Sequence, residues 1–229
     1  QPDLVPSVIE EERQRMVDFL GDTLVICNSY QAQKEWGFKR SKVIWHGLDP
    51  AEYPPSLYQK AIITVGGGMR HRPHYRGYYL FQKVIQGIHC NTVSGDMPET
   101  DIKISEPIGA FADMNEYAYH RFRNYVDLIR EYSIFFNPTL RSPMPRCRAE
   151  AMLCGLAIVT ANNHDVDMFI KNGVNGFYSS DADELREFLL YLKKSPARVE
   201  RIGREGRKTA MELFHIGRYL NEWQETIED

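Results

Sequence analysis

Short, continuous apolar segments alternate along this chain with amphipathic segments of helical period, and this alternation limits the possible fold more than any other feature. The apolar segments are Leu24–Cys27, Val43–Trp45, Ala61–Val65, Ile102–Ile104, Ile134–Phe136 and Leu156–Thr160. A strand that is apolar along its whole length is typical of a parallel sheet that is buried on both faces. We therefore predict an α/β fold with a Rossmann-like parallel sheet and helices on both of its faces.

The segments between the predicted strands place apolar residues on one helical face. Three helices of this kind are predicted, over residues 81–88, 118–129 and 185–192. Asp49-Pro50 and Pro54-Pro55 interrupt regular structure, so we expect a boundary between residues 49 and 56. The predicted units are residues 1–50, which are separate or incomplete, residues 57–210, which form one domain, and residues 211–229, which form a final helix.

Charge, hydropathy and cysteine pattern exclude several classes of function. The net charge of -3 argues against a general nucleic-acid binder. No apolar run reaches the ~20 residues that cross a bilayer. The four cysteines form no CxxC pair, so zinc and thioredoxin-like sites lack support. We expect Cys27 and Cys154 to be buried thiols in a reducing compartment, and we expect a cytoplasmic location.

Three glycines follow the predicted strand that ends at Val65, and arginines follow the glycines. Glycines after a buried strand let backbone N–H groups approach an anion closely. Arginines supply charge-assisted hydrogen bonds to phosphate oxygens. We therefore predict a phosphate site that includes Gly67, Gly68, Arg70 and Arg76. The alternative is a surface loop whose arginines are solvated.

A proline-rich loop follows the predicted strand Ile134–Phe136, and a helix is expected to begin near Pro145. Ligands of open α/β sheets bind beyond the carboxyl ends of the strands, where a helix N-terminus attracts phosphate. Arg146 adds positive charge there, and the carboxylate of Glu150 can accept two hydrogen bonds from a ribose diol. The alternative is that Glu150 is a charge on the helix surface, paired with Arg146.

A polar loop, residues 162–167, follows the last of the predicted strands and also lies at a carboxyl strand end. His164, Asp165 and Asp167 are too close together in the sequence, and lack a separated third ligand, to indicate a metal site. We therefore expect no metal, and we expect this loop to line a ligand cleft.

Five segments, in this order, carry a resemblance to a known family. They are "VICNS…VIWHGLD" before residue 50, "ITVGGGM…RG" at residues 63–77, "SPMPRCRAEAMLCGLAIVT" at residues 142–160, "NGVNGF" at residues 172–177, and the tail from Phe214 to Trp223. These segments resemble motifs of retaining glycosyltransferase family four, which has the GT-B fold. The resemblance implies the end of an N-terminal domain at residues 1–50, a nucleotide-sugar-binding C-terminal domain at 57–210, and a C-terminal crossing helix at 211–229.

By position, the resemblance places Arg76 on the diphosphate-binding lysine of the family and Glu150 on the glutamate that binds the ribose. The family's nearby arginine falls on Gly67, so Arg70 would supply that charge. The family's other glutamate, which faces the donor sugar, falls on Ser142. A hydroxyl cannot supply the negative charge of a carboxylate near a developing oxocarbenium ion. The implied diphosphate site is Gly67, Gly68, Arg70, Arg76 and Arg146, and the implied sugar pocket is Ser142, Pro143, Met144, Pro145 and Asp165.

The predicted function is retaining, metal-free transfer of a hexose from a nucleotide sugar to a hydroxyl of a saccharide or lipid-linked acceptor, without a cofactor. No catalytic residue is predicted. The departure at Ser142 would mean an unusual donor sugar, a move of the charge to Asp165 or Asp167, or a weakened enzyme. One alternative is a nucleotide-sugar-binding module without catalysis. The other is a nucleotide-sugar epimerase on the same fold, which would use His164 and Asp165.

The acceptor-binding part of the family has no counterpart in these 229 residues. We therefore expect the chain to be the donor half of a longer enzyme, which binds nucleotide but transfers no sugar by itself. The full-length protein is expected to be cytoplasmic and peripheral to the membrane, with no nucleic-acid partner.

Overall fold

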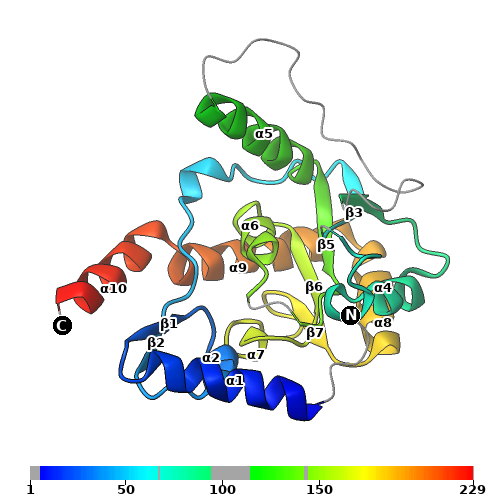
Figure 1. Cartoon of the computed structure of the whole chain (residues 1–229). Helices are drawn as coiled ribbons and strands as arrows, with labels where there is room; N and C mark the ends of the chain where they lie inside the picture. Colours follow the sequence, from blue (N-terminus) through cyan, green and yellow to red (C-terminus); the bar gives the residue numbers. More distant parts are fainter. Residues whose placement is uncertain (1–5, 67, 94–113, 142–143, 229) are drawn as a thin grey trace.

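The chain forms a five-stranded parallel sheet with helices on both faces, next to a smaller unit built on two parallel strands (Figure 1). The computed structural model describes residues 6–66, 68–93, 114–141 and 144–228. The strand order of the large sheet is β4-β3-β5-β6-β7, and that of the small sheet is β1-β2. The predicted Rossmann-like α/β fold is therefore confirmed.

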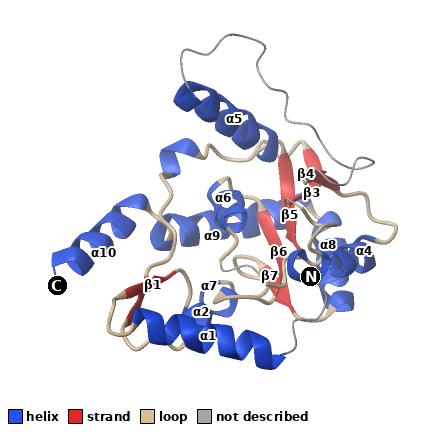
Figure 2. Ribbon diagram, viewed as in Figure 1, coloured by secondary structure: helices blue, strands red, loops and turns tan. Residues whose placement is uncertain are grey.

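Strands and helices mostly alternate along the chain, although α3 is followed by α4 and the last three elements are all helices; Figure 2 distinguishes helices from strands by colour. They are α1 Pro6–Leu20, β1 Val25–Cys27, α2 Tyr30–Trp36, β2 Ser41–Val43, the 3₁₀ helix η1 Pro50–Glu52, β3 Lys60–Val65, α3 Pro73–Arg76, α4 Tyr78–Ile85, β4 Asn91–Val93, α5 Met114–Ile129, β5 Tyr132–Asn137, α6 Arg146–Leu153, β6 Ala157–Ala161, α7 Val166–Phe169, β7 Phe177–Ser179, α8 Ala182–Lys193, α9 Pro196–Leu213 and α10 Ile216–Glu228.

Four of the six predicted strands lie where the apolar runs placed them, as β1, β3, β5 and β6. The run Val43–Trp45 overlaps β2 by one residue, because β2 pairs with β1 from Ser41 to Val43 and then ends. Ile102–Ile104 lies outside the described residues. The strand β4 was not predicted, since its three residues Asn91, Thr92 and Val93 hold too little apolar sequence to form a run.

Two apolar layers cover the large sheet. On one face, Phe81 and Val84 of α4 pack with Leu185 and Leu189 of α8. On the other face, the core joins α5, α6, β5, β6 and the end of α9. The three predicted amphipathic helices correspond to α4, α5 and α8, of which α4 and α8 cover one face of the sheet and α5 the other.

The residues before η1 form the small unit, and the chain returns to it at its end. Leu48 forms a β-bridge with His215, and the Arg218 guanidinium donates to the carbonyl oxygens of Trp45 and His46 at 2.7 and 3.1 Å. The helix α10 therefore lies against the N-terminal segment, toward which it extends in Figure 1. The predicted limits of the units stay predictions, although α9 continues through residue 210 to Leu213.

Two further predictions concern the cysteines and the membrane. Cys27 and Cys154 are buried, as expected, and Cys90 and Cys147 are also unpaired. Among the helices of the described residues, none combines the length and the apolar character that a bilayer span requires.

Candidate functional site

The sheet has a topological switch point between β3 and β5. β3 pairs with β4 on one side and with β5 on the other, so the chain crosses to the opposite side of β3 after β4. Ligands of open α/β sheets bind at such a point, beyond the carboxyl ends of the strands. Here the switch point is bordered by the loop after Val65 and the loop after Asn137. The two loops touch, since the N–H groups of Leu140 and Arg141 donate to the Tyr75 carbonyl oxygen at 3.0 and 2.9 Å.

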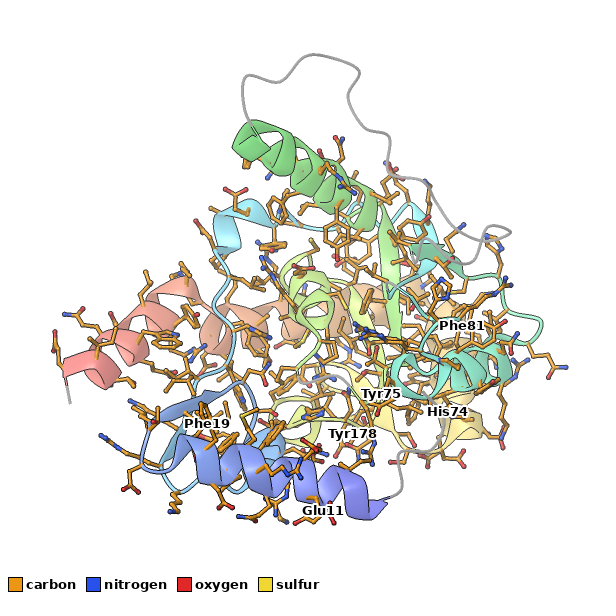
Figure 3. All side chains as sticks on the ribbon, in the orientation of Figure 1. Glu11, Phe19, His74, Tyr75, Phe81 and Tyr178 are labelled. Carbon is orange, nitrogen blue, oxygen red and sulfur yellow. The ribbon has the colours of Figure 1, made fainter. Side chains whose placement is uncertain are left out.

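Gly77 allows this contact between the loops. Its φ is +71°, in the left-handed region, and a Cβ at this position would lie 1.8 Å from the carbonyl oxygen of Pro138. Only glycine fits both the conformation and the space. The short helix α3, which carries His74 and Tyr75 in Figure 3, is thereby held against the loop that leaves β5.

The predicted diphosphate-binding arginines follow β3 and β5, the two strands on either side of the switch point. Arg70 is exposed, and its guanidinium carbon lies 5.8 Å from the centre of the Tyr78 ring. Burial raises the pKa of the Cys147 thiol to about 12, and the nearby charge of Arg76 opposes this rise. Arg146 is the first residue of α6, and its side chain is 60 % exposed. Arg70 and Arg76 therefore lie in the segment that follows β3, and Arg146 begins the helix that follows β5.

Glu150 lies on the second turn of α6 and is only 7 % exposed. Its Oε1 accepts hydrogen bonds from Arg146 Nε at 3.0 Å and from the Tyr53 hydroxyl at 3.5 Å. Its Oε2 accepts a hydrogen bond from the Tyr125 hydroxyl at 2.8 Å. The alternative that Glu150 is a surface charge is therefore wrong, although its pairing with Arg146 is confirmed. Burial raises the pKa of Tyr125 well above its ordinary value, and the Glu150 carboxylate adds to this rise.

Asp165, which was predicted to line the sugar pocket, binds the N-terminal end of α2. Its Oδ2 accepts from the Tyr30 N–H at 2.7 Å and from Trp45 Nε1 at 2.9 Å, and its Oδ1 accepts from the Gln31 N–H at 3.0 Å. A carboxylate is favourable there because the helix dipole is positive at that end. Asp165 therefore joins the two units of the chain, and its place in the sugar pocket stays a prediction.

We expect Asp165→Asn to lower the free energy of unfolding by about 1.5 kcal/mol, because an amide loses the charge and one of the acceptor oxygens. Urea unfolding measures this change. The control is Asp167→Asn, which removes the same charge from an exposed position two residues away. Equal stabilities of the two variants would show that the contact with α2 does not stabilise the fold.

The loop between β5 and α6 is also in contact with the N-terminal segment. His46 Nε2 donates to the carbonyl oxygen of Met144 at 3.1 Å. Burial lowers the pKa of His46 below its ordinary value, which favours the neutral ring. Met144 is buried, and its φ of 34° is unusual for a residue other than glycine. Of the predicted sugar pocket, the structure thus describes Met144 and Pro145, whereas Ser142 and Pro143 lie outside the described residues. Gly67 of the predicted diphosphate site also lies outside them.

Arg148 is a residue of this region that the sequence pattern did not single out. It is 1 % exposed and lies on α6, where six consecutive residues are buried. The signal in the sequence that could have indicated a buried arginine was a cation among small and apolar residues of one helix. The helical period alone, however, does not show that both sides of a helix are covered by other elements. Within the ranges described, no group of three or more His, Cys, Asp or Glu side chains could hold a metal ion.

Comparison with solved structures shows the same fold in larger proteins. HepE of Anabaena, in complex with UDP and glucose, is 17 % identical, with a TM-score of 0.72 over 96 % of this chain and 67 % of that chain. Sucrose-phosphate synthase of Thermosynechococcus elongatus is 16 % identical, with a TM-score of 0.72 over 96 % of this chain and 61 % of that chain. This chain thus spans about two thirds of the length of these proteins.

A more distant likeness is that to TarM of S. aureus, in a complex with fondaparinux, α-GlcNAc-glycerol and UDP. It is 11 % identical, with a TM-score of 0.68 over 94 % of this chain and 46 % of that chain. The sequence has no significant match among curated proteins. Residues 96–225, more than half of the chain, match the family model described as glycosyl transferase-like. The chain therefore belongs to the glycosyl transferase-like family, and its parallel sheet is the Rossmann-like C-terminal domain of a GT-B fold.

Proposed function

We propose that this chain binds the nucleotide-sugar donor of a glycosyltransferase, which transfers a hexose with retention to a hydroxyl of a saccharide or lipid-linked acceptor. The observation that carries the proposal is the contact between the loops after β3 and β5 at the switch point, since the first leads to Arg76 and the second to the Arg146–Glu150 pair. HepE, which shares the fold, holds UDP-glucose in one structure and UDP in another. Hexose and retention rest on the resemblance to family four.

In the proposed reaction, the bond between the anomeric carbon and the diphosphate oxygen breaks, and the diphosphate leaves with the electron pair. The acceptor oxygen forms the new bond to the anomeric carbon, and its proton passes to the departing diphosphate oxygen. Arg70, Arg76 and Arg146 would stabilise the negative charge that grows on the diphosphate. The proposal assigns this charge stabilisation to arginines rather than to a metal or a cofactor.

The ribose contact requires one rearrangement. A carboxylate has about four lone-pair sites, and three hydrogen bonds from Arg146, Tyr53 and Tyr125 already occupy Glu150. A ribose diol needs two acceptor sites. The exposed Arg146 side chain is the partner that is free to move, and the diphosphate offers it another anion. In this proposal, Arg146 turns from Glu150 to the diphosphate as the donor binds, which exposes Oε1 to the ribose.

We expect Arg76→Ala to weaken nucleoside-diphosphate binding by about tenfold, because one charge-assisted hydrogen bond contributes roughly 1.5–3 kcal/mol. Calorimetry with UDP, GDP and ADP, followed by the corresponding nucleotide sugars, measures the affinity and identifies the base. The control is Arg72→Ala, which removes an equal charge from an exposed neighbour. Unchanged affinity in Arg76→Ala would remove Arg76 from the site, and equal losses in both variants would indicate only a general effect of charge.

One sequence feature favours a second candidate function, a nucleotide-sugar-binding module without catalysis. Ser142 stands where the family has the glutamate that faces the donor sugar. Donor hydrolysis by the full-length protein separates the two candidates, because a module without catalysis binds the donor and leaves it intact. The epimerase alternative has less support, since His164 Nδ1 lies 3.0 Å from Ser29 Oγ and Asp165 binds α2.

A further inference from the structure

Three residues other than glycine adopt a left-handed backbone at the carboxyl ends of β5 and β6. Met144 has a φ of 34°, His164 of 32° and Asp165 of 57°. Met144 lies in the loop after β5, and the other two lie in the loop after β6. Such conformations are costly, and they persist only where the surroundings hold them in place. Two neighbouring loops therefore need groups that fix them.

Arg148 lies between these two loops and contacts both. Its guanidinium donates to Asn163 Oδ1 at 2.8 Å and to the His164 carbonyl oxygen at 3.4 Å, in the loop after β6. The same group lies 3.7 Å from the Met144 sulfur, in the loop after β5. It also donates to Thr160 Oγ1 at 3.4 Å and lies 5.2 Å from the centre of the Phe169 ring. A planar fork of five N–H donors is suited to bridging two segments in this way.

Burial of the positive charge of Arg148 is unfavourable for the free energy of folding. Burial lowers the pKa of Arg148 to about 10, so the group is still protonated at neutral pH. Within the described part of the chain, no carboxylate forms an ion pair with it and its hydrogen-bond acceptors are neutral, so the nearby charge of Asp165 offsets the cost of burial only in part. A buried cation without a paired anion is unfavourable for stability. A neutral side chain of similar size would fill the space without that cost, so the bridging contacts are what the arginine adds.

The N-terminal segment contacts the same loops from another side. His46 donates to the Met144 carbonyl oxygen at 3.1 Å, and the side chain of Gln31 accepts from the His164 N–H at 2.9 Å. Arg148 and the N-terminal segment therefore hold the same strained backbone. The two loops lie at the strand ends beside the switch point, which is where the proposed donor sugar binds.

We propose that Arg148 is a positioning residue for sugar transfer: it bridges Met144 to Asn163 and His164, and so holds two loops in the arrangement that receives the donor sugar. The inference rests on the proposed function, and Arg148 acts through the loops rather than by touching the substrate. Preorganised groups around a reacting centre lower the barrier because they need no rearrangement during the reaction. The diphosphate contacts of Arg76 and Arg146 and the ribose contact of Glu150 are proposed for side chains that do not bond Arg148, whose partners are in the two loops and at the end of β6.

The test compares UDP with UDP-glucose on the 229-residue chain and on Arg148→Met. We expect UDP affinity to change by less than about twofold, and the gain in affinity that the glucose adds to fall by about fivefold or more. A purely structural role would lower both affinities together. Arg148→Lys keeps the charge but cannot bridge both loops, so we expect it to behave like Arg148→Met. Full recovery of the glucose gain with lysine would overturn the bridging role.

Hydrogen exchange tests the bridge without a ligand. In Arg148→Met, and in Arg148→Lys should the methionine variant fail to fold, we expect faster exchange in residues 162–166, where the N–H groups of Asn162 and His164 donate to the Ser179 carbonyl oxygen and the Gln31 side chain. The control is Arg186→Met, which removes an arginine that bonds the Val84 carbonyl oxygen between α8 and α4. Unchanged exchange in residues 162–166 would refute the bridge. A wild-type chain that binds no nucleotide would refute the proposed function, and the positioning role with it, whatever the exchange shows.

Discussion

Gly77→Ala is expected to lower the free energy of unfolding by about 3 kcal/mol or more, as overpacking combined with backbone strain does elsewhere. The added Cβ would lie 1.8 Å from the Pro138 carbonyl oxygen and 2.7 Å from its carbonyl carbon. Both are backbone atoms, so no side-chain rotation relieves the contact. The loop after β5 must move away from α3, and the hydrogen bonds from Leu140 and Arg141 to Tyr75 would then be lost.

The chain offers a close control in Gly87→Ala. Gly87 has the same φ of +71°, but a Cβ there would meet nothing within 4 Å. This variant therefore carries only the cost of a left-handed alanine, about 1–2 kcal/mol. Urea unfolding of the two variants separates backbone strain from the contact with Pro138. Equal losses of stability would mean that the approach of the two loops is not as close as the structure places it.

Gly77→Ala is also expected to weaken nucleoside-diphosphate binding, since Arg76 precedes Gly77 and moves with it. Gly87→Ala leaves this part of the chain untouched, so its UDP affinity should match that of the unsubstituted chain. Calorimetry below the melting temperature of both variants makes this comparison. A stability loss without a loss of affinity would argue that α3 keeps its place and that Arg76 does not depend on the contact.

The sequence was sufficient to predict the strands of the sheet wherever apolar residues form long runs. β6 is buried at every residue, β5 at all but one, and β3 at Ile62, Ile63 and Thr64, so continuous apolar sequence was a direct signal. β4 lies next to β3 at the sheet margin, and only its central residue is buried. Its threonine and asparagine take part in strand pairing without forming an apolar run. Apolar runs in the sequence therefore indicate central strands more clearly than short outer strands.

The site was predictable to the extent that it depends on local order. Glu150 was singled out because it follows a strand, a loop and a helix start in sequence, and its pairing with Arg146 is confirmed, whereas its contact with the ribose stays a prediction. Asp165 illustrates the opposite case. Its partners Tyr30 and Gln31 are 135 and 134 positions away, and no local pattern encodes contacts between the two units. The same is true of His46 and Met144, which are 98 positions apart.

The most decisive result for the ligand concerns Glu150→Gln, which we expect to weaken UDP binding by about thirtyfold, or ~2 kcal/mol, because charge-assisted hydrogen bonds to the ribose are lost. Glutamine keeps the shape and removes the charge. The structure adds a second expectation, since the buried carboxylate also bonds Arg146 and Tyr125. We therefore expect the free energy of unfolding to fall by about 1 kcal/mol as well.

Tyr125→Phe separates these two effects. It removes the hydrogen bond at 2.8 Å to Oε2 and leaves the carboxylate in place. We expect a similar loss of stability, about 1 kcal/mol, with UDP affinity close to that of the unsubstituted chain. Glu150 would then act on the ligand through its own charge rather than through the stability of α6. Equal losses of affinity in Glu150→Gln and Tyr125→Phe would assign the effect to packing instead.

Comparison of UDP with 2′-deoxy-UDP identifies the atoms involved. If the Glu150 carboxylate accepts a hydrogen bond from the 2′ hydroxyl, the deoxy ligand already lacks that partner, and Glu150→Gln must cost it less than it costs UDP. Interactions that share a partner are not additive, so the difference between the two losses measures their coupling. We expect UDP to lose more affinity than 2′-deoxy-UDP by about 1 kcal/mol, roughly fivefold. Equal losses for the two nucleotides would show that Glu150 does not contact the 2′ hydroxyl, and would leave its carboxylate as a structural partner of Arg146 and Tyr125.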